Sequence, residues 1–171
     1  MNLCATPPAN RMIDRERKIE LMALALAEAR RGAEEGEVPV GAIVVSRDAG
    51  SAGAAVIAAA HNRPIALNDP TAHAEMLALR AAATTLGAYR LEGAAMFVTL
   101  EPCVMCVGAM VHARIAELYF GARDPKAGAL GSVYDIGRDG LLNHRIEVYG
   151  GLMEAECAAL LRDFFRARRR A

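Results

Sequence analysis

Hydrophobic and polar residues alternate along the chain with two different periods. Across residues 15–35, apolar positions recur every three to four residues with charges between them, a spacing that predicts an amphipathic helix. Its predicted buried stripe is Ile19, Met22, Leu26 and Ala29. Residues 38–46 and 56–60 are short apolar runs, so we predict two strands there. The Gly-containing residues 47–55 between them predict a dispensable hairpin loop, because loop-closure entropy grows only slowly with length.

The second half of the chain repeats this order of strand and helix. A helix is predicted to begin near Pro70, capped by Asp69 or Thr71, and to end at Gly87. Its predicted buried stripe is Met76, Leu79, Ala83 and Leu86. The later predicted elements are strand 96–100, helix 103–112, strand 115–120, a connection over 121–140 with about one helical turn, strand 146–149, and a helix from residue 151 with Ala158, Leu161 and Phe165 in its stripe. This alternation predicts an α/β layered fold whose site lies at strand ends.

The length of the chain fits one domain with a sizeable core. We expect a single domain over residues 15–171, and a mobile extension over residues 1–14, which carry two prolines and no clear period. No apolar run is long enough to span a membrane, and the first residues lack the charged start and apolar stretch of a secretory signal. We therefore expect a cytoplasmic protein.

Charge is balanced overall but uneven in its distribution. Twenty Lys and Arg residues match twenty Asp and Glu residues, which argues against broad binding to polyanions. The last ten residues, however, carry five arginines against Asp163 alone. On composition this cluster is equally a phosphate-binding patch or a solvated helix end whose cations favour the C-terminal dipole.

Two of the four cysteines form a Cys-x-x-Cys motif directly after a predicted strand. Pro102 is placed to begin a helix, which puts Cys103 and Cys106 on one face of its first turn. A helix N-terminus favours thiolate, the form that binds a metal. We therefore interpret this pair as metal ligands, Cys157 as a small core residue, and Cys4 as part of the extension.

A third ligand is available upstream in the sequence His73-Ala74-Glu75. Two residues apart on a helix point about 200° away from each other, so we expect only one of them to bind the ion. His73 with the two cysteines gives the three protein ligands of a catalytic zinc that keeps one open position. His73 as a core histidine and Glu75 as a surface acid is the alternative, but the combination with Pro-Cys-x-x-Cys favours a catalytic site.

His-x-Glu followed by Pro-Cys-x-x-Cys is the signature of zinc-dependent nucleobase and nucleoside deaminases, of which the tRNA adenosine deaminases are an example. From about Ile19 to Arg170 the chain resembles the bacterial tRNA-specific adenosine deaminases. The segments that carry the resemblance are 38–42, 61–65, 69–75, 98–110, 121–124, 143–145 and 163–166.

The resemblance implies a three-layer, cytidine-deaminase-like α/β fold with a mixed sheet of about five strands flanked by helices. It implies one Zn²⁺ per subunit, held by His73, Cys103 and Cys106, and hydrolytic deamination of the wobble adenosine of tRNA to inosine, with Glu75 as the proton shuttle. It also implies that the protein is a homodimer that binds the tRNA anticodon stem-loop. The residues implied to contact the RNA are Asn62, Asp124, His144 and Arg168.

Two other functions remain open at this point. A zinc deaminase acting on a free base, nucleoside or nucleotide, such as guanine or cytidine, would share the same motif. A non-catalytic zinc module that binds RNA would need a fourth protein ligand and would give Glu75 no purpose.

Overall fold

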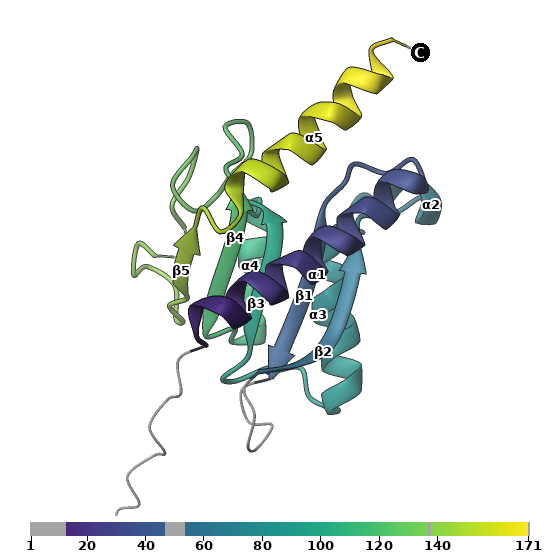
Figure 1. Cartoon of the computed structure of the whole chain (residues 1–171). Helices are drawn as coiled ribbons and strands as arrows, with labels where there is room; N and C mark the ends of the chain where they lie inside the picture. The colour runs from purple at the N-terminus through teal and green to yellow at the C-terminus, as the bar shows by residue number, and fades with distance from the viewer. Residues whose placement is uncertain (1–12, 47–53, 137, 171) are drawn as a thin grey trace, which may run out of the picture.

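The sheet has five strands in the order β2-β1-β3-β4-β5 (Figure 1). The structure is a computed structural model that describes residues 13–46, 54–136 and 138–170. Its strands are β1 (Gly41–Ser46), β2 (Ala55–His61), β3 (Ala95–Leu100), β4 (Glu117–Ala122) and β5 (Glu147–Gly150). β1 pairs antiparallel with β2 and β3, whereas the β3–β4 and β4–β5 pairs are parallel. The sheet is therefore mixed, as expected.

Helices cover both faces of this sheet. They are α1 (Arg15–Glu34), α2 (Pro64–Leu67), α3 (Ala74–Leu86), α4 (Val104–Ala113) and α5 (Glu154–Arg168). Residues of α3 and α4 pack in one core cluster with Ala42 and Val44 of β1, and residues of α1 and α5 pack in a second cluster with Ile43 and Val45. Since successive strand residues face opposite sides of a sheet, the two clusters lie on opposite faces. The predicted three-layer α/β architecture is confirmed.

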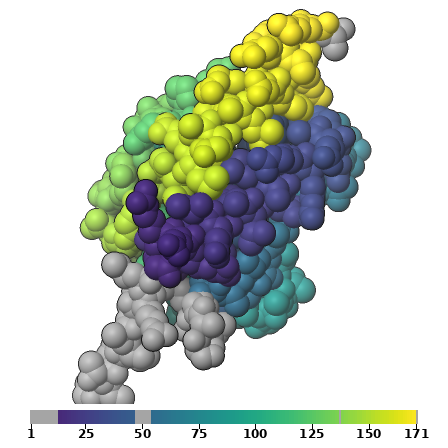
Figure 2. All heavy atoms as spheres, viewed as in Figure 1, coloured from purple at the N-terminus to yellow at the C-terminus, as the bar shows by residue number. Residues whose placement is uncertain are grey.

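α5 lies beside α1 on one face, and its C-terminal end runs out past the sheet (Figures 1 and 2). Within α5 only Cys157 is buried, which confirms it as a core residue. Phe165 of the predicted stripe is instead 42 % exposed.

The buried faces of α1 and α3 match the predicted stripes in part: Met22, Leu26, Ala29 and Leu79 are buried as predicted. Ile19 and Leu86 are exposed, because small side chains let each helix approach the sheet along a neighbouring face. The buried residues of α1 are Leu21, Met22, Ala25, Leu26, Ala29 and Gly32, and those of α3 are Ala74, Glu75, Ala78, Leu79 and Ala82. On α3 most of the buried positions are alanines, which apolar patterning weights less than Met76 and Leu86.

Several predicted boundaries shift by a few residues. β1 starts at Gly41 rather than at Val38, because Val38 to Val40 form a turn closed by a 2.8 Å bond from Val40 N–H to Val38 O. The short helix α2 was not predicted; Pro64 occupies its first turn and Asn68 ends it in the left-handed conformation. In the described part of 121–140, the hydrogen bond from the Gly128 N–H to the Asp124 carbonyl at 3.0 Å closes one turn of helical type, as predicted, and turns and isolated bridges make up the rest.

The predicted N-terminal extension and the 47–55 loop fall mostly outside the described residues. Ile13 and Asp14 are described: Ile13 is buried in the second cluster, and the Asp14 carboxylate caps α1. Over the ranges that the structure covers, no helix has the length and apolar character needed to cross a membrane.

Candidate metal centre and active site

The N-termini of α3 and α4 meet at one cavity of about 270 Å³. His73 and Cys103 are the N-cap residues of these helices, and each has an extended backbone. The cavity is lined by Val38, Val40, Asn62, Pro64, His73, Glu75, Leu100, Glu101, Cys103, Asp124 and Ala127. Residues from five separate stretches of the chain therefore surround one space.

Both helices begin later than the sequence predicted. Asp69 does not cap α3; its Oδ1 accepts hydrogen bonds from the Thr71 N–H and hydroxyl, both at 2.7 Å, which closes a turn ahead of the helix. Likewise Pro102 precedes α4, which starts at Val104. The predicted caps of α3 and the predicted first residue of α4 are therefore wrong. The actual N-cap side chains, His73 and Cys103, approach each other to 3.8 Å at the site and do not bond to their own helices.

His73, Cys103 and Cys106 form a triangle of metal-binding atoms. The two sulfurs lie 3.8 Å apart, and His73 Nδ1 lies 3.8 Å from Cys103 Sγ and 3.6 Å from Cys106 Sγ. A tetrahedral zinc, with Zn–S bonds of about 2.3 Å and Zn–N bonds of about 2.0–2.1 Å, separates two sulfurs by about 3.8 Å and sulfur from nitrogen by about 3.5–3.6 Å. The three residues therefore fit one zinc ion.

No fourth protein ligand accompanies them in the part of the chain that the structure describes. Among the described residues, these three are the only group of His, Cys, Asp or Glu side chains found close enough to share an ion. Three protein ligands leave one tetrahedral position for water or substrate, which is the pattern of a catalytic zinc.

The electrostatics of the triangle favour a bound cation. A hydrogen bond from the Cys106 thiol lowers the pKa of Cys103 to about 4, and hydrogen bonding to Cys103 raises the pKa of His73. The bond to Cys103 and burial together raise the pKa of Cys106. Cys103 is therefore the sulfur that favours the thiolate form, the form that binds a metal.

Glu75 lies in the first turn of α3 and is only 4 % exposed. Burial raises the pKa of its carboxyl group, while the charge of His73 acts in the opposite direction. Because His73 precedes the helix, the predicted separation of about 200° does not apply, and both side chains line the cavity. Glu75 is nevertheless outside the metal-binding group, so a carboxyl group stands beside the metal site without belonging to it.

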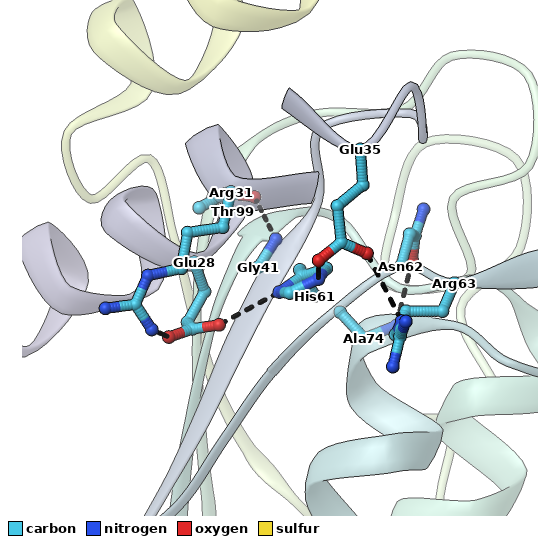
Figure 3. Close-up of polar contacts among 9 residues, drawn as sticks. All are labelled: Glu28, Arg31, Glu35, Gly41, His61, Asn62, Arg63, Ala74 and Thr99. Carbon is cyan, nitrogen blue, oxygen red and sulfur yellow. Dashed lines mark hydrogen bonds and ion pairs between the residues drawn. The ribbon is translucent and has the colours of Figure 1, made fainter. Parts of the chain in front are cut away.

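Asn62 connects the end of β2 to the start of α3. Its Oδ1 accepts a 2.8 Å hydrogen bond from the Ala74 N–H, and the side chain lines the cavity (Figure 3). This bond spans 12 residues, so Asn62 is not a turn residue bonded to its own neighbourhood. Its carbonyl end supplies α3 with the cap that His73 does not provide, and the amide NH₂ lies at the opposite end.

The other three predicted RNA-contacting residues lie in different places. Asp124 lines the cavity, and its Oδ1 also accepts from the Lys126 N–H at 2.9 Å. His144 Nε2 lies 2.7 Å from the Ile115 carbonyl oxygen, and Arg168 donates to the Gly36 carbonyl at 3.0 Å. Neither His144 nor Arg168 lines the cavity.

Glu101 is a site residue to which the sequence assigned no role. It is 2 % exposed, and its carboxylate accepts from the N–H groups of Asp124 (3.2 Å), Leu130 (3.0 Å) and Ser132 (3.1 Å), and from the Ser132 hydroxyl. Burial alone would raise its pKa, but these four hydrogen bonds lower it, with Ser132 the strongest. The only sequence signal was a Glu beside the Pro-Cys motif, since its donors lie 23 to 31 residues further on.

Comparison with known proteins agrees with this geometry. The family described as cytidine and deoxycytidylate deaminase zinc-binding region matches residues 15–122. A tRNA-specific adenosine deaminase of Agrobacterium fabrum is 47% identical over 152 residues, which are 89% of this chain and 96% of that protein.

Solved structures show the same relationship. One from a study of A-to-I editing by wobble-position tRNA deaminases is 47% identical, has a TM-score of 0.77, and is aligned over 83% of this chain and 99% of that one. A guanine deaminase from Nitrosomonas europaea is 29% identical with a TM-score of 0.67, over 90% and 85% of the two chains. The chain belongs to the zinc-binding cytidine and deoxycytidylate deaminase family and, within it, to the tRNA-specific adenosine deaminases.

Proposed function

We propose that this protein hydrolyses the wobble adenosine of tRNA to inosine. The observation that carries the proposal is the placement of a zinc-sized triangle of ligands and a separate buried carboxyl group in one small cavity. The near-full-length similarity to tRNA-specific adenosine deaminases supports adenosine in tRNA as the substrate.

In this proposal His73, Cys103 and Cys106 hold the zinc ion and Glu75 moves protons. Zinc bound there supplies a Lewis acid that lowers the pKa of water towards 7. Glu75 accepts a proton from the attacking water and delivers it to ring nitrogen N1. It then takes the remaining proton from the new hydroxyl on C6 and passes it to the amine, which leaves C6 as ammonia. Water and adenosine thereby become inosine and ammonia. The raised pKa of Glu75 suits a group that must both accept and donate at neutral pH.

The cavity is suited to one extruded base. Its volume lies near the lower end of the range of about 300–1,000 Å³ for small-molecule sites, and apolar side chains such as Val38, Val40 and Leu100 form part of its wall. Bases of an anticodon loop are already partly unpaired, so extrusion costs a few kcal/mol at most.

We assign the polar contacts to four residues. Asn62 and Asp124, which line the cavity, contact the extruded nucleoside and its neighbour. His144 and Arg168 contact the RNA outside the cavity, with the arginines at the end of α5 on phosphates. The resemblance to tRNA deaminases supports these roles.

The same resemblance supports a homodimer, which sedimentation at micromolar concentration would test. We also propose a cytoplasmic location, because the metal-binding cysteines must stay reduced and the cytosol keeps thiols in that state.

The deciding experiment compares tRNA with free substrates. The zinc-loaded protein is incubated with tRNA and, separately, with free adenosine, guanine and cytidine, and wobble inosine and released ammonia are measured. Inosine in tRNA with little ammonia from the free compounds supports the proposal. Turnover of guanine or cytidine alone would replace it with deamination of a free base or nucleoside, and zinc-dependent RNA binding without turnover would leave a non-catalytic module.

A further inference from the structure

A cluster of charged side chains lies behind Asn62, on the side of β2 that faces α1 (Figure 3). His61, the last residue of β2, has Nδ1 3.0 Å from Glu28 Oε2 and Nε2 3.4 Å from Glu35 Oε1. Arg63 Nε lies 3.3 Å from the other oxygen of Glu35. We name these four residues, Glu28, Glu35, His61 and Arg63, the α1 anchor.

The inner part of the anchor is shielded from solvent. The side chains of His61 and Glu28 are each 13% exposed, whereas those of Glu35 and Arg63 are 43% and 44% exposed. The His61 ring lies against Gly32 of α1, where an added Cβ would come within 3.3 Å of His61 Cβ. The His61–Glu28 contact is shielded from solvent, so it should hold its geometry better than an exposed ion pair, whose net contribution to the free energy of folding is close to zero.

The anchor fixes both chain neighbours of Asn62. His61 and Arg63 are tied to α1, the Asn62 N–H bonds the Val40 carbonyl at 3.0 Å, and the Asn62 side chain bonds the Ala74 N–H. Val40 lines the cavity, and Ala74 lies between His73 and Glu75. Asn62 is therefore held by its own two hydrogen bonds, and its chain neighbours are held by α1 and its C-cap, which contribute no side chain to the cavity lining.

We propose that His61, with Glu28 and Glu35, is a positioning residue for the deamination reaction, acting through Asn62 on the substrate and on the start of α3. This inference rests on the proposed function, because it assigns the anchor a role at that site. A misplacement of about 1 Å at a reacting centre can lower the rate about 100-fold, so holding Asn62 in place has a measurable kinetic effect.

Two readouts separate positioning from a general contribution to stability. The first is a double-mutant cycle on kcat/KM for an anticodon stem-loop, with His61→Ala, Asn62→Ala and both together, at equal zinc content. We expect His61→Ala alone to lower kcat/KM about tenfold or more, and to lower it little further when Asn62 is already alanine. The second is amide hydrogen exchange at Ala74, which we expect to speed up in His61→Ala while Leu77, bonded to the His73 carbonyl, keeps its rate.

Two further variants complete the test. In His61→Asn, the side-chain amide nitrogen is as many bonds from Cβ as Nδ1 is in histidine, so it can contact Glu28 in its place. Relative to His61→Ala, this variant should therefore restore part of both readouts. Arg31→Ala is the matched control: it removes the exposed partner 2.6 Å from Glu28 Oε1 and leaves the His61–Glu28 contact, so both readouts should match wild type.

The proposal is overturned if His61→Ala leaves the exchange of Ala74 unchanged, or if the kinetic effects of His61→Ala and Asn62→Ala simply multiply. If His61→Ala does not fold, Glu28→Gln, which keeps the side-chain size, carries the same two measurements. Should Asn62→Ala be too slow for the cycle, exchange at Ala74 decides alone. Amide hydrogen exchange at Ala74 is measured without substrate. If the wild-type protein makes no inosine, the proposed function is refuted, but the role of the α1 anchor in holding Asn62 can still be tested by exchange.

Discussion

The N-terminus of α1 and those of α3 and α4 are built in different ways. α1 begins after Asp14, whose carboxylate accepts the Arg17 N–H at 2.8 Å. α3 and α4 begin after His73 and Cys103, and neither side chain bonds an amide at the start of its helix. A side-chain cap stabilises a protein by about 1 kcal/mol, and neither helix receives that contribution from its own N-cap residue. In return, their N-cap side chains are free to bind a metal.

At α3, the cap comes from another part of the chain. Asn62 reaches across from the end of β2 to cap α3, so its acceptor completes the fold while its donor end remains available. At α1 the cap comes from the helix's own sequence and serves the fold alone. A helix start that faces a site is thus stabilised from elsewhere in the chain, and the following changes test that distinction.

The largest effect should come from giving α4 an ordinary cap with Cys103→Ser. Serine is a preferred N-cap residue but a poor zinc ligand, so bound zinc should fall from one per chain to near zero and deamination should be lost. The zinc-free variant should be more stable than chelator-treated wild type by about 1 kcal/mol in urea unfolding. Retention of one tightly bound zinc would remove Cys103 from the ligand set.

A smaller loss is expected for Glu75→Gln, in the first turn of α3. The amide cannot shuttle a proton, so inosine formation should fall by about 10²- to 10⁴-fold while the zinc content measured by elemental analysis stays the same. Glu92→Gln, on an exposed turn, is the matched control and should behave as wild type. Full activity of Glu75→Gln would assign the proton transfer to another group.

Glu101→Gln should have a moderate effect, because it changes what holds the cavity wall rather than the chemistry. In wild type, backbone N–H groups donate to the Glu101 carboxylate; in the variant, some of them would face the NH₂ group of glutamine, which cannot accept. The segment from Asp124 to Ser132 should therefore loosen, and kcat/KM should drop about tenfold. Zinc content should not change. Unaltered kinetics would show that the wall is held by its own backbone bonds.

The same residue predicts a pH dependence of stability. The folded protein lowers the pKa of Glu101 below its ordinary value of 4.5, so its contribution to the free energy of unfolding is present above pH 4.5 and is lost as pH falls through the lowered pKa. Urea unfolding from neutral to acidic pH should show a smaller acid loss in Glu101→Gln than in wild type. Parallel curves for the two proteins would contradict this assignment.

The smallest effect should follow Asp14→Ala, which removes the cap of α1. The free energy of unfolding should fall by about 1 kcal/mol, while zinc content and kcat/KM stay at wild-type values. A loss of activity per folded molecule would mean that the α1 N-terminus is not purely structural.

Much of the fold followed from local patterns. Gly87 ends α3 in the left-handed conformation with φ 64°, as its place after the apolar run predicted. Cys103 and Cys106 were recognisable because three-residue spacing at a helix start brings their sulfurs together. Such features depend on neighbours within one helical turn, which a sequence displays directly.

The features that escaped prediction depend on distant partners. Nothing near Glu101 indicates that four donors more than 20 residues away would converge on it. The anchoring of His61 by Glu28 joins residues 33 positions apart, and the bond from Arg168 to Gly36 joins residues 132 apart. These contacts arise only when the sheet brings its covering helices together.

The metal triangle has one further consequence, for how the chain is held together. A cation bound by His73 and Cys103 would cross-link positions 30 residues apart. Closing a loop of that length covalently stabilises a protein by about 3–4 kcal/mol in the chain-entropy model. The ion would then also tie the start of α3 to the start of α4, so the stability of the fold, and not only the reaction, would depend on zinc.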